Sequence, residues 1–234
     1  MIEKLFTPDF FRSVSGVIID KLTQYLSDDS IRGLCFIPQP ELKQQVKEMM
    51  QFNDNMPDIE RLKQIVERYV ETGIQVHSTG YMGRQFTPVV PFIPVFEAIG
   101  ALVNQPASLY EAGQLPNIAE KVMCEELGKY IGWEYPNYDM ITTSGGSLAN
   151  LTALLAARNH FFPEIAKKGM CRWTKQRVPA IAISADIHYS IQKSVSVLGL
   201  GSQNIITLPL NEKRQIDVHR AKQCLDSAEN TGLH

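Results

Sequence analysis

Residues 141–159 read ITTSGGSLANLTALLAARN, and this stretch decides the fold class of the chain. A short strand is expected to end at Thr143, two glycines follow, and a helix is expected to open at Ser147. Glycines let the backbone N–H groups of a helix start approach an anion closely, and the helix dipole adds partial positive charge. The pattern therefore predicts a strand, an anion-binding loop and a helix. A plain Gly-Gly turn capped by Ser147 explains the local pattern equally well.

The same alternation of strand and helix continues downstream. A first strand is expected over residues 139–143 and a helix over 147–160. Further strands are expected at 180–184 and 204–208, and further helices at 187–198 and 217–229. Such an order implies right-handed crossovers and a mostly parallel sheet covered by helices, so the expected fold class is α/β.

Upstream of the loop the pattern is helical. Amphipathic helices are expected over 10–26, 40–52 and 57–73, and two more apolar ones over 95–104 and 116–131. Between His77 and Gln114 the chain is rich in Gly and Pro, which excludes one regular helix there. The character changes near His77, so we expect a helical N-terminal segment, 1–76, with a role in dimerisation, and an α/β domain, 77–234.

Composition argues against several classes of protein. The 234 residues hold 23 Lys and Arg against 25 Asp and Glu, so no basic surplus points to nucleic acid or to a membrane surface. The most apolar stretch, Val89 to Val103, is too short to span a bilayer, and no signal peptide is expected. The four cysteines lie far apart without a CxxC pair, so no metal site is expected and a reducing, cytoplasmic location is favoured.

His188 is a second candidate site residue. It follows the apolar strand at 180–184 and opens the next helix, at the sheet edge where ligands of parallel sheets bind. Its ring can stack on a flat ligand there. As a lone histidine it is more simply explained as a helix cap or a packed side chain.

The loop and its surroundings resemble a known family. The text TSGGSLANLTALLAARN, followed by FFPEIAKKG, is similar to the phosphate-binding segment of the group II pyridoxal-phosphate (PLP) decarboxylases, which act on glutamate, aspartate, cysteine sulfinate and aromatic amino acids. The loop is neither GxxxxGK[ST] nor GxGxxG, so the ATP and dinucleotide fingerprints do not apply. The resemblance runs from His77 to about Val218.

The resemblance implies a fold, a cofactor and residue roles. It implies the large domain of a fold-type-I, PLP-dependent transferase-like protein, with pyridoxal 5'-phosphate as cofactor. It assigns the cofactor phosphate to Gly145, Gly146 and Ser147. In IHYSIQK it assigns to His188 the imidazole that stacks on the pyridine ring, with Ser190 and Lys193 at the family's spacing. Lys193 is expected to be a solvated helix residue.

The irregular segment HSTGYMGRQF, residues 77–86, resembles the substrate-side segment of the family. That segment more often reads His-Pro-x-aromatic, and Ser78 stands here in place of the proline. By resemblance His77, Tyr81, Gln85 and Phe86 are candidates for substrate binding. A packed loop at a dimer interface is an almost equally good interpretation of each.

The implied activity is decarboxylation of an L-amino acid by a cytoplasmic homodimer with its active site at the interface. In the family, the Schiff-base lysine and the aspartate that pairs with the pyridinium follow a strand that would come after residue 234. We therefore expect an incomplete domain that lacks both residues and is inactive alone. Two alternatives remain: another fold-type-I PLP enzyme, such as an aminotransferase or a carbon–carbon lyase, and a truncated non-catalytic homologue that acts as an interaction module.

Overall fold

Contacts in the computed structural model divide the chain after Asn104 into two units, 1–104 and 105–234. The structure describes residues 2–28, 36–49, 59–83, 85, 87–173 and 178–233. No helix within these ranges combines the length and the apolar character that a membrane crossing requires. The expected division after residue 76, and the dimerisation role of the segment before it, stay predictions.

The first unit is helical in its described part, as the periodicity predicts. Its elements are η1 (Ile2–Phe6), α1 (Pro8–Ser27), α2 (Gln39–Met49), α3 (Ile59–Thr72) and α4 (Ile93–Val103). Thr7 caps α1 by accepting a hydrogen bond from the Phe10 amide at 3.3 Å. Helices α1 and α3 pack together, and Lys21 Nζ lies 2.6 Å from Glu67 Oε1 across that contact.

Arg61 of α3 secures the end of α2. Its guanidinium donates to the carbonyl oxygens of Glu48 and Met49 at 2.7 to 3.0 Å. The last carbonyls of a helix have no partner within the helix and carry partial negative charge. A cation at this place therefore satisfies these acceptors and stabilises the helix end.

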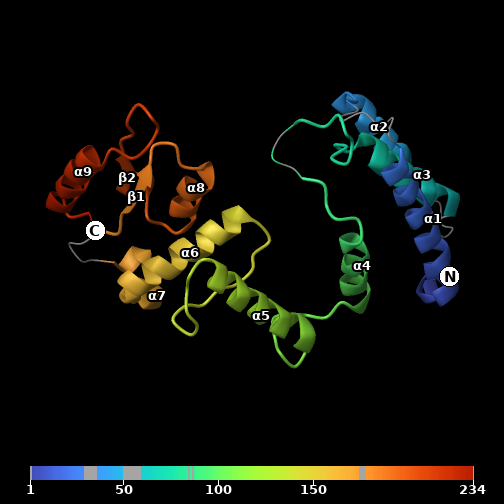
Figure 1. Ribbon diagram of the computed structural model, residues 1–234, viewed down its shortest axis with the longest axis horizontal. Helices are drawn as coiled ribbons and strands as arrows, with labels where there is room; N and C mark the ends of the chain where they lie inside the picture. Colours follow the sequence, from blue (N-terminus) through green and yellow to red (C-terminus); the bar gives the residue numbers. More distant parts are fainter. Residues whose placement is uncertain are drawn as a thin grey trace. The chain divides into compact units, whose positions relative to one another are not determined.

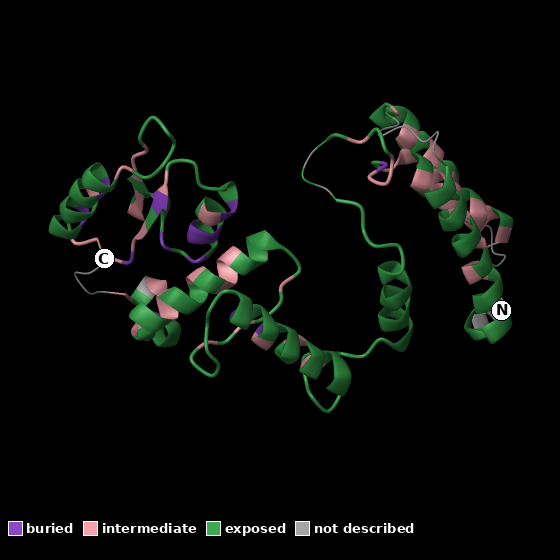
Figure 2. Ribbon diagram, viewed as in Figure 1, coloured by how far each residue is buried: buried purple, intermediate pink, exposed green. Residues whose placement is uncertain are grey.

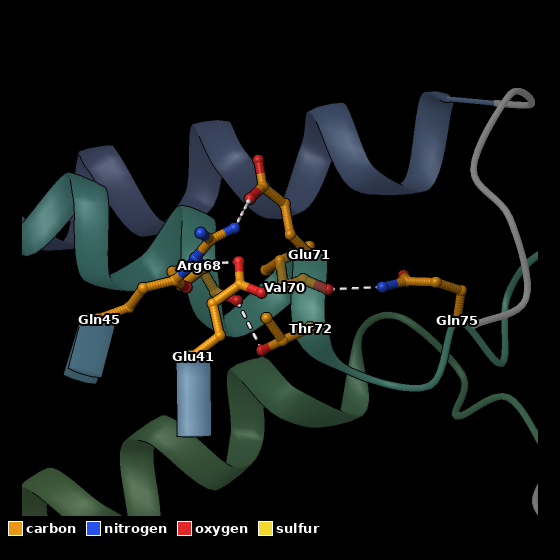
Figure 3. Close-up of polar contacts among 7 residues, drawn as sticks. All are labelled: Glu41, Gln45, Arg68, Val70, Glu71, Thr72 and Gln75. Carbon is orange, nitrogen blue, oxygen red and sulfur yellow. Dashed lines mark hydrogen bonds and ion pairs between the residues drawn. The ribbon is translucent and has the colours of Figure 1, made fainter. Parts of the chain in front are cut away.

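Helix α3 ends in a side-chain cap that leads into the irregular segment (Figure 3). The buried amide of Gln75 donates to the carbonyls of Val70 and Gly73, and Thr72 Oγ1 donates to the Arg68 carbonyl at 2.8 Å. These bonds satisfy acceptors that the end of the helix leaves open. The chain direction is thereby set two residues before His77.

Helix α4 is apolar and exposed along its whole length (Figure 2). Its C-cap is Asn104, which has a left-handed conformation (φ 48°) and whose amide donates to the Gly100 carbonyl. The side chains of Phe92, Phe96 and Leu102 remain 58 to 65 % exposed.

The second unit carries the α/β pattern (Figure 1). Its elements are α5 (Gln114–Tyr130), α6 (Gly146–Phe161), α7 (Pro163–Lys168), η2 (Met170–Arg172), β1 (Ile181–Ser184), α8 (Tyr189–Val197), η3 (Ser202–Asn204), β2 (Ile205–Leu208) and α9 (Val218–Asn230). Strands β1 and β2 pair in parallel, with Ile181 opposite Ile205 and Ser184 opposite Leu208. Helix α9 packs against β2, and α6 packs against α8.

The core of this unit lies between the sheet and two helices. Val195, Leu198 and Leu200 are buried at the end of α8, and Figure 2 shows buried residues gathering at β1 and α8. The partly buried residues Leu151, Leu154, Met170, Ile181 and Ile205 pack against them. The hydrophobic side of α6 is therefore fixed to α8 and, through it, to the first residues of both strands.

The expected strand at 139–143 is wrong. These residues form no strand, because two of their amides bond to side chains instead of to a neighbouring strand. The Met140 amide donates to Asp139 Oδ1 at 2.9 Å, and the Thr142 amide donates to Glu120 Oε1 at 2.7 Å. The remaining strand and helix expectations of this unit are confirmed to within three residues at their ends.

Candidate functional site

The Gly145–Ser147 loop forms the start of α6. The helix begins at Gly146, with Gly145 as its N-cap. The Gly145 carbonyl accepts from the amides of Leu148 and Ala149 at 3.0 and 3.1 Å, and from Thr143 Oγ1 at 3.2 Å. The alternative interpretation, a Gly-Gly turn capped by Ser147, is wrong, since Ser147 lies inside the first turn and no side chain caps this end.

This helix start is chemically suited to an anion. In the described part of the chain, the amides of Gly146 and Ser147 have no acceptor. A Cβ built on Gly145 or Gly146 would meet no atom within 4 Å, so the space in front of the loop is open. Unpaired amides at the positive end of a 16-residue helix bind phosphate groups readily. These residues fit a phosphate-bearing ligand.

Glu120 of α5 holds the segment that leads into the loop. Its Oε1 accepts from the amide and from Oγ1 of Thr142, at 2.7 and 2.6 Å. The hydroxyl and then the amide of Thr142 hold the pKa of the Glu120 carboxyl below its ordinary value. The carboxylate therefore fixes the backbone three residues before Gly145.

His188 stands at the start of α8, as the sequence predicts. It is the N-cap, and its ring accepts from the Ser190 amide at 3.3 Å. Its Nδ1 also lies 2.8 Å from Ser190 Oγ. The ring is exposed and packs against that of Tyr189, with centroids 4.3 Å apart and planes inclined by 43°.

Asn150 joins the two helix starts. Its Nδ2 donates to Ser190 Oγ at 2.8 Å, and Ser190 is 1 % exposed. Since Asn150 lies one turn into α6 and Ser190 in the first turn of α8, the bond ties the loop and His188 to the same end of the unit. The helix that begins at the Gly145–Ser147 loop is thus bonded, near its start, to the helix that His188 caps.

Asn150 was not predicted from the sequence. The available signal is a polar residue within the apolar run Leu148-Ala149-Asn150-Leu151, since a half-buried amide favours a hydrogen-bond partner. Its partner is 40 residues away, so the bond cannot be recognised from spacing. Lys193, expected to be a solvated residue, is exposed on α8.

The substrate-side candidates lie in the first unit, whereas the loop and His188 lie in the second. The His77 ring packs edge-on against Tyr25 of α1, with centroids 5.7 Å apart. The Tyr81 hydroxyl is buried without a hydrogen-bond partner among the described residues. Gln85 is exposed in a turn, and Phe86 lies outside the described residues. The substrate role of all four stays a prediction.

Metal-binding groups and cysteine thiols are the other possible reactive features of the described residues. In the ranges that the structure describes, no group of three or more His, Cys, Asp or Glu side chains is placed to hold a metal ion. Cys124 and Cys224 are free thiols. Burial, and then the charges of Glu120 and Asp139, raise the pKa of the Cys124 thiol, so it is a poor nucleophile.

Comparison with curated sequences finds amino-acid decarboxylases. The chain is 24 % identical over 214 residues to L-aspartate decarboxylase dtxS4 of Metarhizium robertsii, with 89 % of this chain and 42 % of that protein covered. It is 21 % identical over 227 residues to acidic amino acid decarboxylase GADL1 of Xenopus tropicalis, with 95 % and 42 % covered. The chain spans less than half the length of these relatives.

Comparison with solved structures finds the same fold. Mouse CSAD in its apo form matches with a TM-score of 0.84 at 20 % identity, over 96 % of this chain and 46 % of that one. Oryza sativa TDC, solved with PLP and tryptamine, matches with a TM-score of 0.82 at 15 % identity, over 97 % and 48 %. The expected fold, an incomplete fold-type-I large domain, is confirmed.

The third comparison is with protein families. Residues 40–234 match the pyridoxal-dependent decarboxylase conserved domain, which covers the loop, His188 and the irregular segment. The chain therefore belongs to the pyridoxal-dependent decarboxylase family, whose cofactor is pyridoxal 5'-phosphate.

Proposed function

We propose that this chain supplies the phosphate- and ring-binding part of an enzyme that removes the α-carboxylate of an L-amino acid. One observation carries the proposal: the open loop at Gly145–Ser147 and the exposed ring of His188 are tied to the same end of the second unit. An anion site beside a flat aromatic ring suits a ligand that joins a phosphate to a planar ring. The relatives named above, which act on aspartate and on acidic amino acids, support the reaction type.

The chain's own residues have separate roles in this proposal. The amides of Gly146 and Ser147 donate to the phosphate, and the Ser147 hydroxyl adds a further donor. The His188 ring packs on one face of the cofactor ring and keeps water from it. When bound, pyridoxal phosphate supplies an electron-withdrawing ring that takes up the electron pair of the bond broken at Cα.

The substrate side of the proposal rests on the irregular segment. His77, Tyr81, Gln85 and Phe86 are assigned to it by resemblance alone. The Tyr81 hydroxyl supports the assignment, because it is buried without a partner among the described residues and so leaves a polar group open to a ligand. The relatives act on different amino acids, so the proposal names the class, an L-amino acid, and no single substrate.

The proposal includes a homodimer in the cytosol. The exposed apolar surface of α4 supports association, since such surfaces mark protein–protein contacts. The free thiols of Cys124 and Cys224 favour a reducing compartment. We further propose that the lysine which holds the cofactor covalently, and the carboxylate which pairs with its ring nitrogen, are not among these 234 residues.

The activity is tested by release of labelled CO2 from carboxyl-labelled L-amino acids with added pyridoxal phosphate. The protein made from its complete reading frame is assayed beside the 234-residue chain. We expect release by the complete protein and none by the chain alone. Release of CO2 by the 234-residue chain alone would show that it contains the lysine and the carboxylate that the proposal places outside it. Transfer of the amino group without CO2 would instead identify an aminotransferase.

Cofactor binding by the chain is measured separately by calorimetry. Pyridoxal phosphate is compared with pyridoxal, which has the same ring and no phosphate. The proposal expects the phosphorylated compound to bind more tightly, by about tenfold or more, because hydrogen bonds to a charged group contribute roughly 1.5–3 kcal/mol. Equal affinity for the two compounds would exclude the loop as the phosphate site.

A further inference from the structure

Three side chains from two helices form a continuous hydrogen-bond chain beside the loop. Asn150 Nδ2 lies 2.8 Å from Ser190 Oγ, and Ser190 Oγ lies 2.8 Å from His188 Nδ1. The Ser190 amide also points at His188 Nδ1, at 3.3 Å. Ser190 itself is held from behind, since its carbonyl accepts from Ser194 Oγ at 2.8 Å.

The chemistry of the donors sets the direction of these hydrogen bonds. A backbone N–H can only donate, so the Ser190 amide requires a lone pair on His188 Nδ1. The Ser190 hydroxyl then donates its single proton to the same nitrogen and keeps its lone pairs for another donor. The Asn150 amide nitrogen supplies that donor. All three bonds are compatible only if the proton of the neutral ring lies on Nε2.

We propose that Asn150 and Ser190 are positioning residues that hold His188 as the Nε2–H tautomer with a fixed ring plane. Two contacts on one ring nitrogen restrict rotation of the imidazole, although the ring is exposed. The lone pair of Nδ1 is occupied, so the neutral ring offers a ligand its flat face and one N–H donor, and no free base.

The consequence for cofactor binding rests on the function proposed above. A ring that is already ordered loses less conformational freedom when a ligand packs on it, at about 0.5–1.5 kcal/mol for each side chain immobilised on binding. Loss of the Asn150 contact is therefore expected to weaken pyridoxal phosphate binding about two- to tenfold. The tautomer itself is independent of the cofactor.

The direct test is two-bond ¹H–¹⁵N NMR of the histidine rings in the 234-residue chain without ligand. It is recorded at alkaline pH, where imidazole side chains are neutral. The signals of His188 are assigned by comparison with His188→Gln. We expect a pyridine-type nitrogen at Nδ1 and a pyrrole-type nitrogen at Nε2. A predominant Nδ1–H form, or an even mixture of the two, contradicts the proposal.

Three variants separate positioning from general structure. Asn150→Asp offers Ser190 only acceptors, which turns the hydroxyl proton away from His188, and Ser190→Ala removes the hydroxyl. Both are expected to raise the share of the Nδ1–H form, with Asn150→Ala between them and the unchanged chain. Asn159→Ala is the matched control, because Asn159 lies on the same helix and bonds Arg158 instead.

The outcomes distinguish this inference from the proposed function. If Asn150→Asp and Ser190→Ala both show the same tautomer as Asn159→Ala, the hydrogen bonds of Asn150 and Ser190 do not hold the His188 ring. If a variant fails to fold, the tautomer of the unchanged chain still decides. If His188 has the Nε2–H form but the protein binds no pyridoxal phosphate, the positioning role of Asn150 and Ser190 is supported and the proposed function is contradicted.

Discussion

Glu120 Oε1 accepts two hydrogen bonds from one residue, the Thr142 hydroxyl at 2.6 Å and its amide at 2.7 Å. This contact joins α5 to the segment before the glycine loop, and an ionised carboxylate accepts such bonds more strongly than a protonated carboxyl does. The Thr142 bonds lower the pKa of Glu120 from its ordinary value of 4.5. The folded state therefore prefers the charged carboxylate.

The first prediction is a pH dependence of stability that Glu120 contributes. Because its folded pKa is lowered, its contribution is fully present above pH 4.5 and is lost as the pH falls through the lowered pKa. Urea unfolding is measured near neutral pH and below pH 4.5. The loss of stability in acid should be smaller in Glu120→Gln than in the unchanged chain. An identical loss of stability in acid in both proteins would show that the Thr142 hydrogen bonds do not depend on the charge of Glu120. Glu111→Gln, on a carboxylate outside this contact, is the control.

The second prediction concerns the close approach of Gly128 and Tyr138. A Cβ on Gly128 would overlap the hydroxyl and the ring of Tyr138, whose hydroxyl donates to the Glu125 carbonyl at 3.2 Å. Gly128→Ala is expected to destabilise the fold by about 1–3 kcal/mol through overpacking. The matched change, Gly16→Ala in α1, meets no atom within 4 Å and should stabilise by about 1 kcal/mol through helix propensity. Urea unfolding free energies check both, and a stabilised Gly128→Ala would contradict the packing.

The third prediction separates folding from cofactor binding at the loop. Gly146→Ala adds a methyl group that meets no protein atom within 4 Å, so the thermal midpoint should stay the same or rise. The methyl group occupies the open space where the phosphate would lie, and affinity for pyridoxal phosphate should fall about tenfold or more. Calorimetry with pyridoxal is the control, since its binding should not change. Unaltered affinity for the phosphorylated compound would place the phosphate elsewhere.

The fourth prediction tests the apolar helix α4. Phe96 is 65 % exposed, and a glutamate there would place charge in any contact that buries this surface. Sedimentation should show dimers for the unchanged chain and a weaker association for Phe96→Glu. Glu97→Gln alters the single charged position of the same helix and should leave the association unchanged. If the unchanged protein sediments as a monomer, the homodimer proposal is contradicted for these 234 residues.

Local patterns were sufficient for much of the fold. The apolar spacing of α1, α3 and α6 predicts helices that the structure contains, and the continuous apolar run at β1 predicts a strand. His188 is predicted at a helix start because the strand before it and the periodicity after it are both local features. Helix α7 was not predicted, although it has a local signal, with Pro163 at its first turn and Gly169 after its last residue.

Long-range partners account for what was missed. Residues 139–143 look like a strand by composition, but Glu120, 22 residues before Thr142, takes its amide. Asn150 and Ser190 lie 40 residues apart, and only the packing of α6 on α8 brings them together. Such bonds depend on tertiary contacts, which have no fixed spacing in one sequence.

The division of the chain after Asn104 bears on how such a protein diversifies. The anion loop and His188 are secured by contacts within the second unit, while the residues assigned to the substrate belong to the first. Under the roles proposed above, substitutions in the first unit would change the choice of amino acid and leave the cofactor contacts of the second unit intact. On that proposal, substrate specificity could change in evolution without rebuilding the part of the protein that binds the cofactor.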